Sequence, residues 1–186
     1  NATAYIATTR YKFDDHTPGL YKTTDYGKTW TKINTGIAGN AFTRVIREDT
    51  KVKDLLFAGT EREVYFTSND GVSWQSLRLN MPASSIRDLV IHDNDLVIGT
   101  HGRSIWILDD FSPLREINNI NTNKSHLFQP SNAFRVRYNM FSDTPLPPEE
   151  PTGQNPPDGA LIDYYLDSNA NKVNLEIVDL KGNKVN

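Results

Sequence analysis

Six side chains that could contact a ligand occur in or beside short turns of this sequence. They are Arg10, His16, Glu61, Arg62, His101 and Arg103. An arginine guanidinium can hold a carboxylate through two parallel hydrogen bonds. His101 and Arg103, separated by one glycine, could therefore bind an anion or the carboxylate of a glycan. The alternative is that Arg62 and Arg103 are solvated or paired with neighbouring acidic side chains, which would leave no site.

A metal site is a second chemical possibility, at Asp14, Asp15 and His16. Hard metal ions need several oxygen ligands, and zinc needs ligands that converge from separate positions. Three adjacent residues cannot all point inward, so the sequence favours a solvated loop there. We predict no metal and no cofactor.

Catalysis would need residues that the sequence does not clearly provide. A glycosidase requires two facing carboxylates at a defined separation, and Glu61, Glu63, Asp14 and Asp15 are the candidates. No Gly-x-Ser-x-Gly turn is present to expose a serine nucleophile, and the chain has no cysteine. The sequence favours a non-catalytic protein. No catalytic residue is assigned, and glycosidase is the enzyme class left open.

A repeated turn organises the chain around these residues. Residues 23–30 read Thr-Thr-Asp-Tyr-Gly-Lys-Thr-Trp, and Thr-x-Asn-x-Gly-x-Ser-Trp follows at residues 67–74, 44 positions later. A short Asp or Asn side chain bonds to its own turn, Gly can adopt positive φ, and a following Trp can bury its ring. We predict tight turns between strands, built by Thr23, Asp25, Gly27, Trp30, Thr67, Asn69, Gly71, Trp74 and, in a degenerate third copy, Asp109.

Strand-like segments recur with a similar period. Gly59-Thr60 is repeated as Gly99-Thr100, and one unit carries four short strands between residues 43 and 77. A period of about 40–45 residues with four strands is typical of a β-propeller blade. We expect an all-β fold with about three four-stranded blades over residues 1–130. Residues 114–117 and 126–130 would complete the third blade.

Strand order predicts where the candidate residues lie. In a four-stranded blade, the connections between second and third strands open on one rim, and the Asp-containing turns lie on the opposite rim. The connections 10–16, 61–62 and 101–103 then share one face of the propeller. We predict that the six ligand-binding candidates lie on this rim.

The composition changes after residue 130. Six of the ten prolines lie between residues 145 and 157, which predicts an extended linker over residues 131–159. Residues 160–166 and 173–179 are strand-like and predict the first strands of an incomplete Ig-like β-sandwich over residues 160–186. Three blades cannot close a ring. We therefore expect a piece of a longer protein, whose remaining blades, or a partner chain, cover the open edges.

Composition limits the classes of partner. The net charge is −3 and no basic stripe is present, so nucleic acid is not an expected partner. No apolar run approaches membrane-spanning length. The 37% hydrophobic content, 11 Gly and 10 Pro suit a turn-rich β protein.

The repeated turn resembles the Asp-box, or BNR repeat, of sialidases and sortilin-type receptors. Residues 21–30, 45–49, 57–61 and 95–110 resemble a bacterial group called sortilin-like or BNR-repeat glycosyl hydrolases, and the resemblance extends over nearly the whole chain. It implies a secreted, periplasmic or cell-surface bacterial protein with a non-catalytic propeller scaffold that binds a protein or glycan. The alternative that it leaves open is a glycoside hydrolase of sialidase-like architecture, with its site partly on other blades. The Arg-Ile-Pro signature of sialidases is absent.

Overall fold

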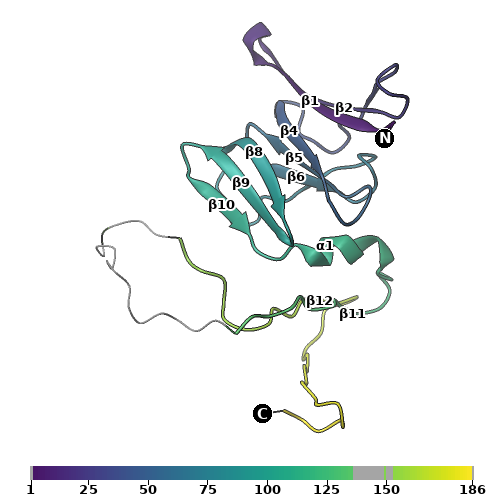
Figure 1. Cartoon of the computed structure of the whole chain (residues 1–186), viewed down its shortest axis with the longest axis vertical. Coiled ribbons are helices and arrows are strands. Elements are labelled where there is room, and N and C mark those ends of the chain that lie inside the picture. Colours follow the sequence, from purple (N-terminus) through teal and green to yellow (C-terminus); the bar gives the residue numbers. More distant parts are fainter. Residues whose placement is uncertain (1, 136–148, 150–152, 186) are drawn as a thin grey trace.

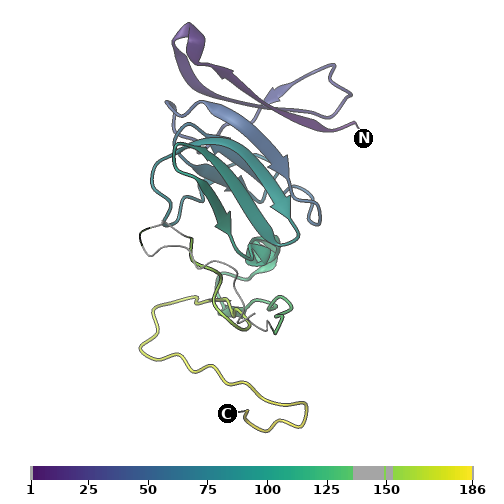
Figure 2. The same cartoon turned by 60° about the vertical axis from the view of Figure 1, so that its left-hand side comes forward.

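The computed structural model describes residues 2–135, 149 and 153–185. In these residues the chain consists of short antiparallel strands, two 3-10 turns and one short α-helix (Figure 1). The all-β prediction is confirmed at this level. Three main sheets follow one another along the chain and stack face to face (Figure 2), and none closes on itself.

The first sheet has the strand order β1-β2-β3. Its strands are β1 (Ala4–Arg10), β2 (Asp15–Thr23) and β3 (Thr31–Lys32), and a 3-10 turn, η1 (Tyr11–Phe13), joins the first two. Asp14 closes this turn with a φ of 58°. The β1–β2 tip projects from the body of the molecule (Figure 1).

The second sheet contains the four strands that the repeat predicts, in the order β4-β5-β6-β7. They are β4 (Thr43–Glu48), β5 (Leu56–Thr60), β6 (Val64–Thr67) and β7 (Gln75–Ser76). Every residue of β5 and β6 is buried. Such strands are covered on both faces, which explains their nearly continuous apolar sequence.

The third sheet has only three strands in the described part of the chain: β8 (Ser85–His92), β9 (Asp95–His101) and β10 (Ile105–Leu108). The prediction of a fourth strand at residues 114–117 is wrong. That segment lies in α1 (Ser112–Glu116) and the 3-10 turn η2 (Ile117–Asn119). Pro113 stands in the first turn of α1, where its fixed φ favours a helix and its missing N–H costs nothing.

Two apolar cores separate the three sheets. The first and second sheets enclose a core that includes Leu20, Ile33, Ile46, Leu56, Ala58, Tyr65 and Trp74. The second and third sheets enclose another, which includes Val45, Phe57, Val64, Phe66, Ile86, Leu89, Leu96, Ile98 and Phe111. Alternate residues of β5 point into different cores, as the two-residue period of a strand requires.

The C-terminal segment differs from the predicted sandwich. Residues 126–127 form β11 (His126–Leu127), which pairs with β12 (Tyr164–Tyr165) and not with the third sheet. The expected hairpin between residues 160–166 and 173–179 is not formed. Val173, Leu175 and Ile177 are 45–59% exposed, so neither face of the second segment is covered, and uncovered strand pairs are marginal in water.

Two further sequence predictions concern this part of the chain. The predicted linker over residues 131–159 lies mostly outside the described residues. Among the described residues, no helix is both long enough and apolar enough to cross a membrane.

Candidate functional site

The connections of the second sheet divide between two rims. On one rim, the N–H of Asp70 in the β6–β7 turn bonds to the carbonyl of Asp54 in the β4–β5 connection (3.0 Å). On the other, the N–H of Glu61 bonds to the carbonyl of Phe42 just before β4 (3.0 Å). We call this second edge the loop rim. It comprises the connections 11–14, 61–63 and 102–104 and the first residues of β4 and β8.

Glu61 is the centre of a hydrogen-bond network on the loop rim. Its Oε2 accepts from Arg44 Nη2 (2.6 Å), Arg44 Nε (2.9 Å) and Ser85 Oγ (2.7 Å). Burial alone would raise the pKa of Glu61, but the bonds from Ser85 and Arg44 outweigh it and lower this pKa below its usual value. Glu61 therefore remains a carboxylate at neutral pH and is unsuited to act as a general acid.

Aromatic side chains hold Arg44 in place. Its guanidinium lies over the rings of Phe42 (4.8 Å) and Tyr11 (5.6 Å), and these two rings stack at 5.3 Å. His16 approaches Phe42 edge-on at 5.7 Å. The projecting β1–β2 tip is thereby joined to the network around Glu61.

Arg87 is a second arginine of the loop rim and lies at the start of β8. Its Nη2 is 3.0 Å from Nδ1 of His101, and it makes no ion pair within the described residues. A groove of about 420 Å³ runs from Arg87 along the edges of β1 and β4, past Arg44 and Arg47. Arg47 is already paired with Asp88 (2.8 Å). Among the described residues, Arg87 is the arginine of this groove that has no ion pair within 4.0 Å, although its charge helps to lower the pKa of Glu61.

Both rim arginines are extra residues in β-bulges. The β4–β5 register shifts between Thr43 and Val45, and the β8–β9 register shifts between Ile86 and Asp88. In each case the arginine is the residue left without a partner, and a bulge re-aims such a side chain. The sequence prediction missed Arg44, Ser85 and Arg87. The recurrence of the two arginines at the same place in successive repeats was the available signal.

The structure brings together only part of the predicted site. Glu61 and His101 lie in the connected group with Arg44, Ser85 and Arg87. Arg10 pairs with Asp15 (3.5 Å) on the projecting tip, and His16, which faces Asp14 (3.6 Å), touches this group through the ring of Phe42. Arg62 and Arg103 are exposed.

The Asp-containing turns stabilise themselves. Asp25 accepts from Thr29 Oγ1 (2.6 Å), Thr29 N (2.9 Å) and Thr23 Oγ1 (2.8 Å). These bonds, those from Thr29 first, lower the pKa of Asp25 to about 2. Asn69 repeats the pattern with Thr67 Oγ1 (2.7 Å) and Ser73 N (3.0 Å). Both side chains thus accept hydrogen bonds from residues of their own turn.

The tryptophans of the two turns differ in burial. Trp74 is 3% exposed, and its indole N–H donates to the carbonyl of Ile33 (2.6 Å). Trp30 is 40% exposed, so the expectation that it buries its ring is wrong. Trp74 lies between the first and second sheets, whereas no described sheet covers the outer face of the first. The glycines adopt the expected left-handed conformation, with φ of 85° at Gly27 and 82° at Gly71.

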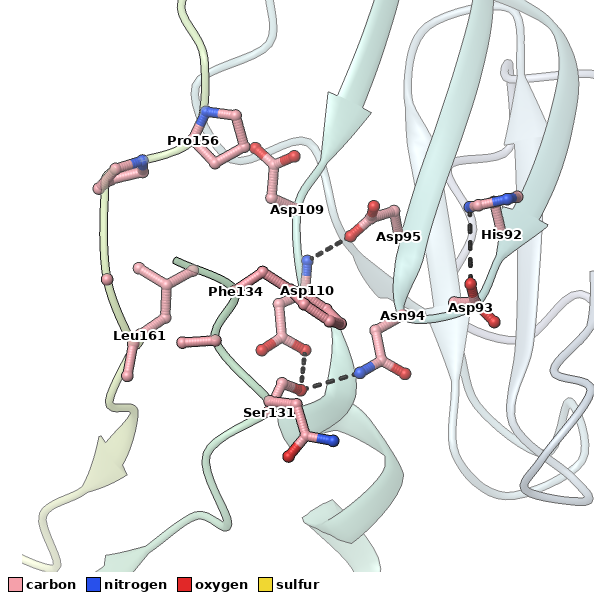
Figure 3. A pocket seen from close by; sticks show the side chains of 15 residues that line it. His92, Asp93, Asn94, Asp95, Asp109, Asp110, Ser131, Phe134, Pro156 and Leu161 are labelled. Carbon is pink, nitrogen blue, oxygen red and sulfur yellow. Dashed lines mark hydrogen bonds and ion pairs between the residues drawn. The ribbon is translucent and has the colours of Figure 1, made fainter. Parts of the chain in front are cut away.

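Asp109 lies in a cleft of about 380 Å³ on the rim opposite the loop rim (Figure 3). Burial and, after it, the charge of Asp95 raise the pKa of Asp109. The turn is organised by the next residue, because Asp110 Oδ1 accepts from Ser112 N (3.2 Å) and Ser131 Oγ (3.0 Å). Asp95 and Asp109 are the carboxylates in this cleft whose charges interact.

We found no metal-binding cluster of side chains in residues 2–135, 149 and 153–185. No group of three or more His, Asp or Glu side chains there could hold an ion. The side chain of Asp14 is fully exposed, and Asp15 accepts from Thr17 N (3.1 Å) and Thr17 Oγ1 (2.6 Å).

Comparison with known families identifies the repeat region. Residues 19–111 match the Sortilin-Vps10 family model, described as sortilin, neurotensin receptor 3. This range is half of the 186-residue chain and contains Glu61, Arg87, His101 and both complete Asp-containing turns. No curated protein shows significant similarity to the chain. The chain belongs to the Sortilin-Vps10 family, whose propeller architecture its stacked antiparallel sheets match.

Proposed function

We propose that this chain is part of a non-catalytic binding scaffold that holds a protein or glycan ligand at the loop rim. The groove beside Arg87 would receive an anionic group of that ligand, such as a carboxylate. The exposed side chains of Arg62 and Arg103 lie on the same rim, where they would contact the ligand farther out. A secreted, periplasmic or cell-surface location in a bacterium belongs to the same proposal.

One observation carries the proposal: the different partners of two equivalent arginines. Gly59-Thr60-Glu61 in the second sheet corresponds to Gly99-Thr100-His101 in the third. Arg44 meets Glu61 and is neutralised, whereas Arg87, in the equivalent bulge, meets a histidine. A guanidinium that has a histidine and not a carboxylate within hydrogen-bond distance, beside a groove, is suited to bind a carboxylate through charge-assisted hydrogen bonds.

The test is an array of matched acidic and neutral glycans, with matched acidic and neutral peptides. We expect acidic members to bind without being hydrolysed. Arg87→Ala should weaken that binding by about 10–100-fold, because hydrogen bonds to charged groups contribute about 1.5–3 kcal/mol. His101→Glu should have a similar effect, because it gives Arg87 the carboxylate partner that Arg44 has.

Lys28→Ala is the control for loss of positive charge, since Lys28 lies in the turn at the opposite rim. It should change affinity by less than about twofold, because charges farther apart than about 10 Å are screened. Equal binding of acidic and neutral members would contradict the proposal. Unchanged affinity in both Arg87→Ala and His101→Glu would also contradict it.

A glycoside hydrolase remains a second candidate because of the cleft in Figure 3. Two carboxylates with different pKa values are the usual acid and base of such enzymes, and Asp109 has a raised pKa beside Asp95. These residues lie at the opposite end of the β9–β10 hairpin from Arg103. Hydrolysis of a chromogenic glycoside that Asp109→Asn abolishes would support this candidate, and binding without turnover would exclude it.

A further inference from the structure

The sequence contains Asp-Gly at residues 70–71 and again at residues 158–159. In such a pair the backbone nitrogen of the glycine can attack the side-chain carbonyl carbon of the aspartate, because glycine has no Cβ to obstruct a close approach of the backbone. A cyclic succinimide forms, and water reopens it to aspartate or to isoaspartate. The reaction in a folded protein therefore depends on how freely the carboxyl group and the glycine nitrogen can meet.

The first Asp-Gly pair is held on both sides. Asp70 Oδ1 accepts from the hydroxyl of Tyr5 (2.7 Å), and Asp70 Oδ2 is paired with Lys22. Gly71 is buried, and its N–H donates to Thr67 Oγ1 (3.2 Å). The nitrogen of Gly71 can reach the carboxyl group of Asp70 only if these bonds open together.

The second Asp-Gly pair lies in an exposed bend outside any helix or strand. Gly159 has a φ of 101°, and a Cβ added to it would have no atom within 4 Å. The backbone N–H of Gly159 makes no hydrogen bond within the part of the chain that the structure describes. No packing and no hydrogen bond of that N–H therefore has to be broken before the nitrogen attacks.

We propose that Asp158 is a site of spontaneous isoaspartate formation in the folded protein, and that Asp70 is protected from the same reaction. A bond forms between the nitrogen of Gly159 and Cγ of the protonated Asp158 side chain. The carboxyl C–OH bond breaks, and the hydroxyl leaves with the amide proton as water. Addition of water at the main-chain carbonyl of Asp158 then breaks the bond from that carbonyl carbon to the nitrogen of Gly159. The mass is unchanged, and no oxidant or reductant is needed.

The position of this site gives the modification a structural consequence. Isoaspartate adds one methylene to the main chain between Pro157 and Gly159, and both of these residues line the cleft beside Asp109 (Figure 3). The chain continues from there into β12, whose pairing with β11 fixes its position. The extra methylene must therefore displace this wall of the cleft. The site is separate from the loop rim and does not depend on the ligand proposed there.

The test compares positions 158 and 70 in one sample of the natural protein, incubated at mildly acidic pH so that some carboxyl groups are protonated. Electron-transfer fragmentation of the digested protein distinguishes isoaspartate from aspartate of equal mass. We expect isoaspartate to accumulate at least about tenfold faster at position 158 than at position 70, because Asp70 can react only after its turn opens locally. In urea that unfolds the protein, the two rates should become similar, since both sequences are Asp-Gly.

Two conservative variants separate the reaction from general damage. Asp158→Glu keeps the negative charge but would need a larger ring that forms more slowly, so the isoaspartate signal between Pro157 and Gly159 should be lost. Asp163→Glu, the same change at a nearby exposed aspartate that precedes tyrosine, should leave the rate at position 158 unchanged. Equal rates at positions 158 and 70 in the folded protein would overturn the proposal. Absence of isoaspartate at position 158 in the folded protein would also overturn it, whatever the urea sample forms.

Discussion

Replacing Arg115 by alanine should destabilise the folded chain by about 3 kcal/mol, the lower end of the range for breaking a buried ion pair. Arg115 donates from Nε and Nη2 to the two oxygens of Asp49, at 2.9 Å each. Their side chains are 9% and 0% exposed. The pair fastens α1, which stands where a fourth strand was expected, to the β4–β5 connection of the second sheet.

The magnitude follows from what remains after the substitution. Asp49 still accepts hydrogen bonds from the N–H groups of Val52 (2.8 Å) and Lys51 (3.3 Å). The loss of stability is therefore at the lower end of the range for a broken buried ion pair. The variant also loses the stacking of Arg115 on Phe111, at 4.5 Å. A urea unfolding slope of about 1–3 kcal/mol per molar would convert the loss into a midpoint about 1–3 M lower.

The assay is urea unfolding followed by tryptophan fluorescence at neutral pH and near pH 3. Burial alone would raise the pKa of Asp49, but the hydrogen bonds from Arg115 and Val52 lower it below the ordinary value. The stability from this lowered pKa is complete above the unfolded pKa of about 3.9 and is lost as pH falls through the folded pKa. Without Arg115, burial raises the pKa, and protonation of Asp49 near pH 3 removes the penalty of an unpaired charge. The difference between the two proteins should therefore shrink in acid.

Lys53→Ala is the control, because it removes an exposed cation from the same connection. Lys53 lies 3.9 Å from Asp54 with its side chain 82% exposed, so its loss should cost less than about 1 kcal/mol. An Arg115→Ala loss no larger than that of Lys53→Ala would refute the reasoning. So would a loss of constant size between the two pH values, since an unpaired buried carboxylate must respond to acid.

Three further predictions concern the turns and the sheet interface. Asp25→Asn should fold like the parent protein, because asparagine serves the equivalent turn, and NMR titration of the parent should give Asp25 a pKa of about 2. Trp74→Phe should cost about 1–3 kcal/mol in urea unfolding, because the buried carbonyl of Ile33 loses its donor. Gly59→Ala should cost about 1–3 kcal/mol by overpacking against Ile86, and a thermal midpoint equal to that of the parent would contradict this.

The Asp-containing turns were predictable because their determinants are local. Each turn is closed by bonds between residues no more than four positions apart, from Thr23 to Thr29 and from Thr67 to Ser73. Burial of the tryptophan that follows each turn is determined by distant parts of the chain. Trp74 is covered by the sheet before it and Trp30 is not, although the two motifs are nearly identical in sequence.

The end of the third sheet was not predictable for the same reason. Residues 114–117 read Leu-Arg-Glu-Ile, with apolar side chains at both ends, and residues 126–130 include a strand-like segment. The choice of a helix depends on Pro113 and on a partner for Arg115 that lies 66 residues earlier. Likewise the apolar alternation of Val173, Leu175 and Ile177 predicts a strand, but no described sheet covers either of its faces.

The candidate site shows how a repeat can be read for function as well as for fold. The sequence prediction selected exposed turn residues, and it therefore found Glu61 and His101 but assigned the arginine role to Arg103. The bulges instead direct Arg44 and Arg87 toward these two residues. Arg pairs with Glu in one sheet, and the equivalent Arg contacts His in the next. The informative position is thus the partner that differs, and converting His101 to glutamate asks directly whether the histidine leaves Arg87 able to bind an anion.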